Sequence, residues 1–291
     1  MNHKTEIMKK ILTIVFLTTM VMGTIITFIS CSKDYKEEAG IEINPKKIFP
    51  SGLPKSVMGM AVQTNEKGQI VSMKSADMNV TFKYVNEKTR SASPSPDVIM
   101  TVIGMYKFVY GPPTGNNKSV YNLYLNKDGY IQRCDEIKYY ERGKPWVNRM
   151  DNFLYDSDGH LIKATIKDGE EIWNWVYEDG DIVRMERMDH GKMDAEPWMV
   201  YYTSEKYPFP LDNKKNLMMF NKNIPADLDD LSLAYFAGLL GTPTKHLPVR
   251  YTEGTMETSS VWTFNEYGTP ISLKVYQGRG HSIIACYSFV W

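Results

Sequence analysis

Residues 152–164 read NFLYDSDGHLIKA: an aromatic run, an acidic turn that ends in a glycine, and an aliphatic run. A short loop between paired strands needs a residue with positive φ, and glycine adopts this conformation without steric cost. Aspartate side chains hydrogen-bond to the backbone of a turn. Phe, Tyr and Ile favour a pleated, half-buried strand. The stretch therefore predicts a β-hairpin whose turn ends at Gly159.

The same pattern recurs, which makes the hairpin the building unit of the chain. Its copies are unevenly spaced, and this argues against an equal-period solenoid or propeller. Between and after them, runs rich in β-branched and aromatic residues alternate with turn residues. We predict an all-β fold, a long antiparallel meander that forms a strongly curved or closed, barrel-like sheet. The further copies occupy residues 62–70, 124–131, 175–182 and 262–271.

Residues 225–240 depart from the strand pattern. Pro225 suits a first helical turn, and three aspartates follow it at the positive end of the helix dipole. Leucine and tyrosine then recur at helical spacing, until Gly241 and Pro243 end the pattern. We predict one amphipathic helix that plugs an open end of the rolled sheet, with docking of a partner as the alternative.

The N-terminus carries three lysines, and residues 11–30 then contain no charged residue. This order is typical of an export signal. Residues 28–31 resemble the lipobox of bacterial lipoproteins, in which the cysteine becomes the lipidated first residue after cleavage. We predict a signal peptide at residues 1–30 and lipidation of Cys31. An uncleaved anchor helix is the alternative, because the apolar run is nearly long enough to span a bilayer.

Residues 31–55 are expected to be the lipidated cysteine and a flexible tether, because they begin with polar residues and contain several prolines. Their partly acidic start resembles the export tag of Bacteroides-type surface lipoproteins. The resemblance implies a protein of the outer membrane, lipid-anchored at Cys31 and exposed at the cell surface, with the periplasmic face as the alternative. Residues 56–291 show no composition break and are predicted to form a single antiparallel β domain.

The charge balance and the cysteines exclude few classes of binding partner. The chain has 34 basic and 34 acidic residues, so no basic field favours nucleic acid. In an oxidising compartment Cys134 and Cys286 either pair or remain two buried thiols, and the sequence leaves both open.

No pattern in the chain predicts a catalytic residue, a metal or a cofactor. Asp156 and Asp158 hint at a calcium loop, but the next alternating oxygen ligand and the distant glutamate are missing, so we predict a plain turn. The histidines lack zinc-site spacing, and Gly280-His281-Ser282 is not a nucleophile elbow. Whether the protein is an enzyme is left open, with non-catalytic as the preferred interpretation.

The tryptophans offer the one suggestion of a ligand site. Trp173 and Trp175 lie two residues apart on one predicted strand and therefore point to the same side. Together with Trp198 they could grip a glycan or a protein ligand. The alternative is that these side chains fill the interior of a rolled sheet, where aromatic residues bury large areas.

The hairpins, the lipoprotein signal and the segment LLGTPTKHLP at residues 239–248 resemble a Bacteroides-type lipoprotein family of unknown function with a porin-like β fold. The resemblance covers residues 56–291 and implies the fold and the address, without catalytic residues. A literal pore is disfavoured because residues 130–140 carry charges on both faces. We therefore predict a cell-envelope lipoprotein that acts as a non-catalytic surface binding or scaffold module. The alternatives are a secreted degradative hydrolase and an outer-membrane pore.

Overall fold

Antiparallel strands make up most of the computed structural model, which describes residues 41–291 except 42, 86–94, 106–115, 140–144, 167–168, 194–195, 219–227 and 279–281. The described residues belong to one compact unit that begins at Ile41. Within them, 17 strands form one sheet, and β14 and β15 form a separate pair. The strands are β1 Ser56–Val57, β2 Met60–Thr64, β3 Ile70–Lys74, β4 Met78–Tyr84, β5 Val98–Met105, β6 Asn116–Leu125, β7 Ile131–Tyr139, β8 Trp146–Tyr155, β9 Leu161–Ile166, β10 Glu171–Glu178, β11 Asp181–Asp189, β12 Lys192–Met193, β13 Trp198–Tyr201, β14 Leu211–Asp212, β15 His246–Leu247, β16 Arg250–Glu253, β17 Met256–Phe264, β18 Pro270–Gln277 and β19 Ser282–Val290.

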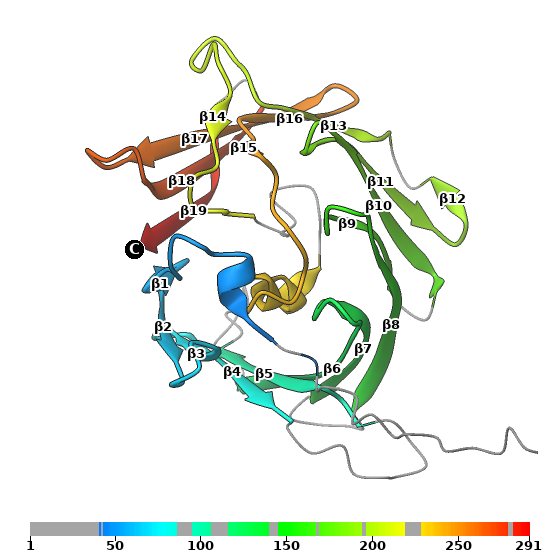
Figure 1. The fold of residues 1–291 in the computed structure, drawn as a ribbon. Coiled ribbons are helices and arrows are strands. Elements are labelled where there is room, and N and C mark those ends of the chain that lie inside the picture. Colours follow the sequence, from blue (N-terminus) through cyan, green and yellow to red (C-terminus); the bar gives the residue numbers. More distant parts are fainter. Residues whose placement is uncertain are drawn as a thin grey trace, which may run out of the picture. The chain divides into compact units, whose positions relative to one another are not determined.

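The sheet follows the order of the chain. From β2 to β11 each strand pairs antiparallel with the next one, and the order continues through β13, β16, β17, β18 and β19. The short strand β1 pairs with both β2 and β19: Ser56 lies opposite Ala61 on one side and Val290 on the other. Figure 1 shows the strands arranged around η1 (Pro45–Lys47) and η3 (Asp229–Tyr235). The predicted all-β antiparallel meander with a single helix is confirmed in this coarse form.

Four of the repeated hairpins share one turn geometry. The Asn or Asp that begins the turn accepts two backbone N–H bonds on its side-chain oxygen, from the second and the fourth residue after it, at 2.8 to 3.0 Å. The side-chain oxygen therefore accepts from backbone N–H groups that a tight reversal would leave without a partner. The four residues are Asn65, Asn126, Asp156 and Asn265.

The hairpin between β10 and β11 turns differently. Glu178 pairs with Asp181, so Asp179 and Gly180 alone form the turn, with φ values of 48° and 85°. Two positive φ values in a two-residue loop match the twist of the flanking strands. The predicted reversals at residues 175–182 and at the four other sites are thus all present, by two local mechanisms.

The predicted helix is present as the 3-10 helix η3, which is shorter than residues 225–240. Residues 225–227 lie outside the described part of the chain, and Phe236 ends the element. Leu231 and Tyr235 on the predicted apolar face are buried and Asp229 is exposed, while the buried surface extends over all of residues 233–237.

The stretch expected to be a tether enters the core. Ile48 and Phe49 are each 1% exposed, and Phe49 packs edge-on against Tyr235 at 5.6 Å between ring centroids. Pro45 fits the first turn of η1, where its missing N–H costs nothing. Prolines discourage long helices and strands, but they do not keep a segment out of a core. Residues 31–40 and 42 lie outside the described part.

Residues 239–246, which we call the cross-turn segment, connect three hairpin turns. The carbonyl of Leu239 accepts from Ile131 N–H at 2.9 Å, and Thr242 N–H donates to Gly159 O at 2.8 Å. Lys245 N–H then donates to Gly180 O at 2.9 Å. The segment therefore holds the β6–β7, β8–β9 and β10–β11 turns at one end of the sheet.

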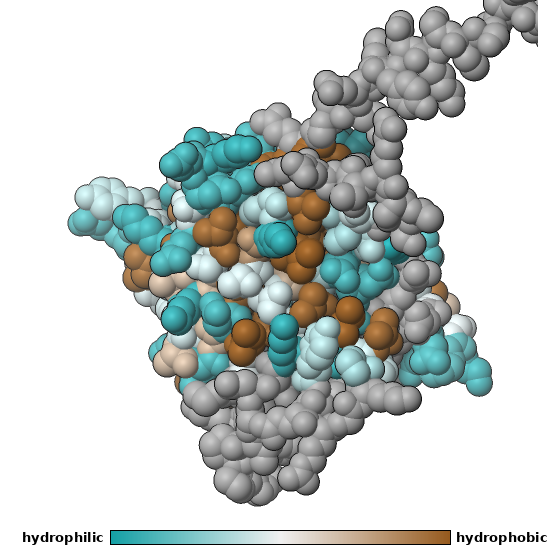
Figure 2. All heavy atoms as spheres, turned by 90° about the horizontal axis from the view of Figure 1, so that it is seen from below, coloured by the Kyte–Doolittle hydropathy of each residue, from teal (hydrophilic) through white to brown (hydrophobic). Residues whose placement is uncertain are grey.

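Charges are present on the outer side of the strands. Arg133 and Asp135 form an ion pair at 3.2 Å, and Lys83 on β4 is exposed. The face at the bottom of Figure 1 mixes hydrophilic and hydrophobic side chains, as Figure 2 shows. In the described part of the chain, no helix has the length and apolar character needed to cross a membrane. Cys134 is buried and Cys286 exposed, and both are free thiols.

Candidate functional site

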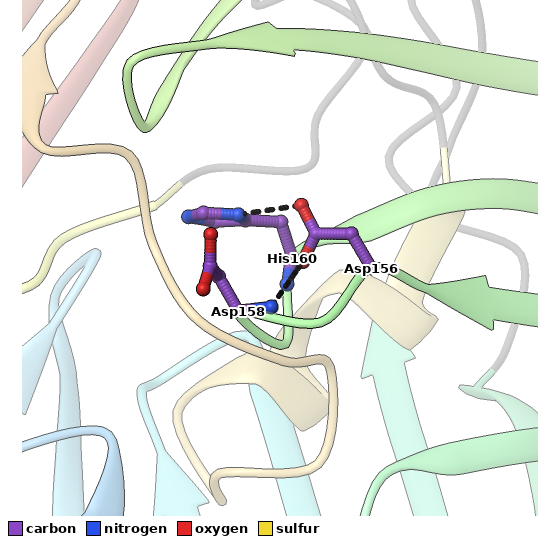
Figure 3. A group of neighbouring side chains, drawn as sticks. All are labelled: Asp156, Asp158 and His160. Atoms are coloured by element: carbon purple, nitrogen blue, oxygen red, sulfur yellow. Dashed lines mark hydrogen bonds and ion pairs between the residues drawn. The ribbon is translucent and has the colours of Figure 1, made fainter.

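The turn that decides the fold also brings together three metal-ligating side chains. Asp156, Asp158 and His160 each place one ligand atom within 4.8 Å of the others (Figure 3). The His160 ring is buried, donates from Nδ1 to Asp156 Oδ2 at 2.9 Å and stacks on Tyr177 at 4.4 Å between ring centroids. Turn geometry explains the proximity, because alternate residues of the turn surround the same carboxylate.

The Asp156 carboxylate is engaged on both oxygens. Oδ1 accepts from the backbone of Asp158 and His160, and Oδ2 accepts from the His160 ring. Partial burial acts to raise the pKa of Asp156, but the hydrogen bonds from His160 outweigh it and hold that pKa below its ordinary value. The negative charge is therefore used to hold the turn.

A metal ion would have to compete with these bonds. Binding through Asp156 would cost the contact to His160, and the equivalent turns at Asn65, Asn126 and Asn265 have the same backbone geometry with an amide in place of the carboxylate. We therefore interpret the group as a structural turn.

A second aspartate–histidine pair holds the far end of the cross-turn segment. Asp181 accepts from His246 N–H at 2.8 Å and from His246 Nδ1 at 2.6 Å. The two pairs use the same chemistry: one carboxylate holds both the backbone and the ring of one histidine. Sequence reasoning missed this pair because the two residues are 65 positions apart.

The three candidate tryptophans are close together. Trp173 and Trp175 are each 2% exposed and stack at 6.3 Å, and the half-buried Trp198 packs on Trp173 at 5.5 Å. The Trp173 indole donates to Glu171 Oε1 at 2.9 Å, and Arg187 Nε lies 3.0 Å from the same oxygen. Ligand binding by these tryptophans stays a prediction, but exposures of 2% mean that a ligand would need to displace the core.

A more accessible site lies outside β16, β17 and β18. A groove of about 840 Å³ runs between these strands and the loop at residues 203–208, a volume in the range of small-ligand sites. We call it the β16–β18 groove. Its lining is Thr203, Ser204, Glu205, Lys206, Tyr207, Pro208, Val249, Arg250, Glu257, Ser259, Ser260, Val261 and Tyr276.

The floor of the groove comes from the register of the sheet. Arg250 on β16 lies opposite Ser259 on β17, which lies opposite Tyr276 on β18. Residues directly opposite in paired strands point to the same side, so this row faces the groove together. The Arg250 guanidinium lies 3.8 Å over the Tyr201 ring and 3.3 Å from the Glu257 carboxylate.

The loop that forms the other wall is held by one side chain. The Tyr207 hydroxyl accepts from Trp262 N–H and donates to Trp262 O, both at 3.1 Å. The hydroxyl thereby gives hydrogen-bond partners to the backbone N–H and C=O of Trp262 on the edge of β17. Trp262 lies beyond Ser259, the last residue of β17 that pairs with β16. The sequence carries no signal for the groove, since the loop wall meets β17 through this contact between residues 55 positions apart.

Comparisons with known proteins give a family and a similar fold. A family model described as "Domain of unknown function (DUF4595) with porin-like fold" matches residues 62–272. A porin-like protein from Bacteroides uniformis is 13% identical, with a TM-score of 0.50 over 79% of this chain and 89% of that one. One from Bacteroides vulgatus is 11% identical, with a TM-score of 0.36 over 80% and 92%. No curated protein matches. The first structure supports the fold alone.

Proposed function

The chain belongs to the DUF4595 family of domains of unknown function with a porin-like fold, and from this premise we propose that it is a cell-envelope lipoprotein whose β domain is a non-catalytic binding or scaffold module. The lipid anchor is Cys31, which lies outside the described residues. The anchor holds the domain on the outer membrane at the cell surface. The ligand is a glycan or a protein, without a cofactor.

The proposal includes a sheet that closes in a barrel-like form. Its support is the pairing of β1 with both β2 and β19, through Ser56 and Val57. A closed sheet leaves no long unpaired strand edge, which suits a domain exposed outside the cell.

The observation that carries the binding role is the β16–β18 groove. It combines hydroxyl, charged and aromatic side chains on a rigid sheet with a loop wall, and a preformed site of this kind pays little ordering entropy when a ligand binds. The second candidate is the cluster of the buried Trp173 and Trp175 with the half-buried Trp198.

Lipidation is tested with the native host. Cells are fed a palmitate analogue, and the purified protein is examined for label, with the Cys31→Ala variant as the control. We expect label on the wild type alone. Protease added to intact cells should release peptides of the wild type from the cell surface, and should release none from the variant. Label on both proteins would refute an anchor at Cys31.

The binding role is tested on the purified full-length chain by capture of extracellular polymers, with assays for turnover and for bilayer conductance in parallel. Binding without either activity supports the module. Cleavage of a bound polymer would indicate the hydrolase, and conductance would indicate the pore.

A further inference from the structure

The donors and acceptors of the β16–β18 groove form a fixed array. Within the described chain, Arg250 has two partners on the outer face, the Tyr201 ring beneath it and the Glu257 carboxylate beside it at 3.3 Å. A guanidinium carries five N–H donors in a planar fork, so one contact to Glu257 leaves donors for a ligand. Glu257, whose side chain is 55% exposed, offers acceptor positions next to them. A ligand thus meets donors and acceptors side by side.

The formal charges around the groove cancel. Lys206 and Arg250 supply two positive charges, and Glu205 and Glu257 supply two negative charges. A strongly anionic or cationic ligand would therefore be repelled by two of these charges and attracted by the other two, so its net electrostatic attraction to the groove would be small. The balance favours an uncharged ligand with both donors and acceptors.

The backbone of the groove is not open to a peptide strand at Trp262. Strand addition needs free N–H and C=O groups along a sheet edge, and the Tyr207 hydroxyl already satisfies both groups of Trp262. Next to Tyr207, recognition therefore falls to side chains. The Tyr207 and Tyr276 side chains and Val261 supply apolar surface between the polar ones.

We propose that the β16–β18 groove binds a neutral oligosaccharide. Each sugar hydroxyl both donates and accepts, which matches the paired guanidinium and carboxylate, and the C–H faces of sugar rings suit the aromatic and aliphatic surface. The inference rests on the proposed binding function and names its ligand class and its residues.

The test is affinity electrophoresis of the full-length chain in mild detergent. Gels contain starch, xylan, galactomannan or a β-glucan, with polygalacturonate as the anionic comparison. We expect retardation by at least one neutral polymer and about tenfold weaker binding for Arg250→Met, because a lost hydrogen-bonded contact of this kind corresponds to roughly one decade in Kd. Glu257→Gln keeps the shape but exchanges an acceptor for a donor, and should weaken binding as well.

The matched control is Lys83→Met on the outer side of β4, which removes one exposed positive charge far from the lining residues. It should bind like the wild type. Unretarded migration in every neutral gel, or equal retardation of the wild type and Arg250→Met, overturns the inference. If polygalacturonate or a captured protein binds instead and Arg250→Met abolishes that binding, the sugar is wrong and the binding module stands. Cleavage of the gel polymer would refute the module itself.

Discussion

At the scale of single residues, Gly241 leaves the least room for a side chain among the glycines of the described part of the chain. A Cβ there would lie 2.3 Å from the Gly159 carbonyl oxygen, and its φ is +84°. A glycine in the cross-turn segment is therefore needed both for backbone conformation and for close approach to the β8–β9 turn.

We expect Gly241→Ala to lower the free energy of unfolding by about 2–4 kcal/mol, because the strain of positive φ adds to a clash with backbone. Gly59→Ala is the control: its φ is +78° but nothing lies within 4 Å of the added Cβ. It should cost only about 1 kcal/mol. Denaturant unfolding measures both, and equal losses would show that the close approach to Gly159 is not tight.

Asp156 makes stability depend on pH. Because its folded pKa lies below the ordinary value, the ionised carboxylate stabilises the fold above the unfolded pKa of about 4. That contribution is lost as the pH falls through the folded pKa, when the carboxylate becomes protonated.

Asp156→Asn removes the titration and keeps the turn, since asparagine begins the equivalent turns at Asn65, Asn126 and Asn265. The difference in unfolding free energy between the wild type and this variant should be largest near neutral pH and shrink below about pH 4. Measurement of the two unfolding curves between pH 2 and 7 decides this. A difference independent of pH would mean that the charge contributes nothing.

At the scale of elements, the cross-turn segment ties together hairpins that are far apart in the sequence. It donates to or accepts from the turns that follow β6, β8 and β10. Hairpins held only by their own ladders are marginally stable, so a segment that connects three turns stabilises all of them.

Asp181→Ala should release one end of this segment. It removes the carboxylate that accepts from His246 N–H and Nδ1, and the side chains of Asp181 and His246 are 13% and 18% exposed. The free energy of unfolding should fall by about 1–3 kcal/mol. Amide hydrogen exchange across residues 239–249 should become faster. Asp189→Ala is the control, because the side chains of Asp189 and its partner His190 are 44% and 69% exposed. Exposed ion pairs contribute about 0–1 kcal/mol to stability. Unchanged exchange in Asp181→Ala would contradict this role.

At the scale of the whole molecule, the proposed closure depends on very little hydrogen bonding. In the described chain Ser56 and Val57 pair with Val290 and Phe289, and two flanking backbone bonds support them, from Lys55 N–H to Val290 O at 2.6 Å and from Met58 N–H to Ser288 O at 2.8 Å.

The combined change Ser56→Cys and Val290→Cys, made with Cys286→Ser, tests the proposed closure. Residues directly opposite in an antiparallel pair have Cα atoms about 4.5–5.5 Å apart, within reach of a disulfide. We expect an intramolecular bond to form on mild oxidation and to raise Tm. The control pair Thr81→Cys and Val290→Cys lies on strands that do not pair and should remain reduced. Failure of the first pair to oxidise would refute closure.

The sequence by itself determined the hairpins and the meander. The turn residues Asn126 and Asp156 bind backbone N–H groups two and four positions away, and strand preference is also a property of short runs. Such local interactions are visible in any window of ten residues.

Only the tertiary structure decided what each strand buries. Alternation shows that Trp173 and Trp175 share a face, but not that this face is interior, and proline content did not reveal that Ile48 and Phe49 enter the core. The bond from Thr242 to Asp158 spans 84 residues. Packing partners of this kind are set by the three-dimensional path of the chain, because burial and long-range hydrogen bonds depend on which surfaces meet and not on the identity of near neighbours.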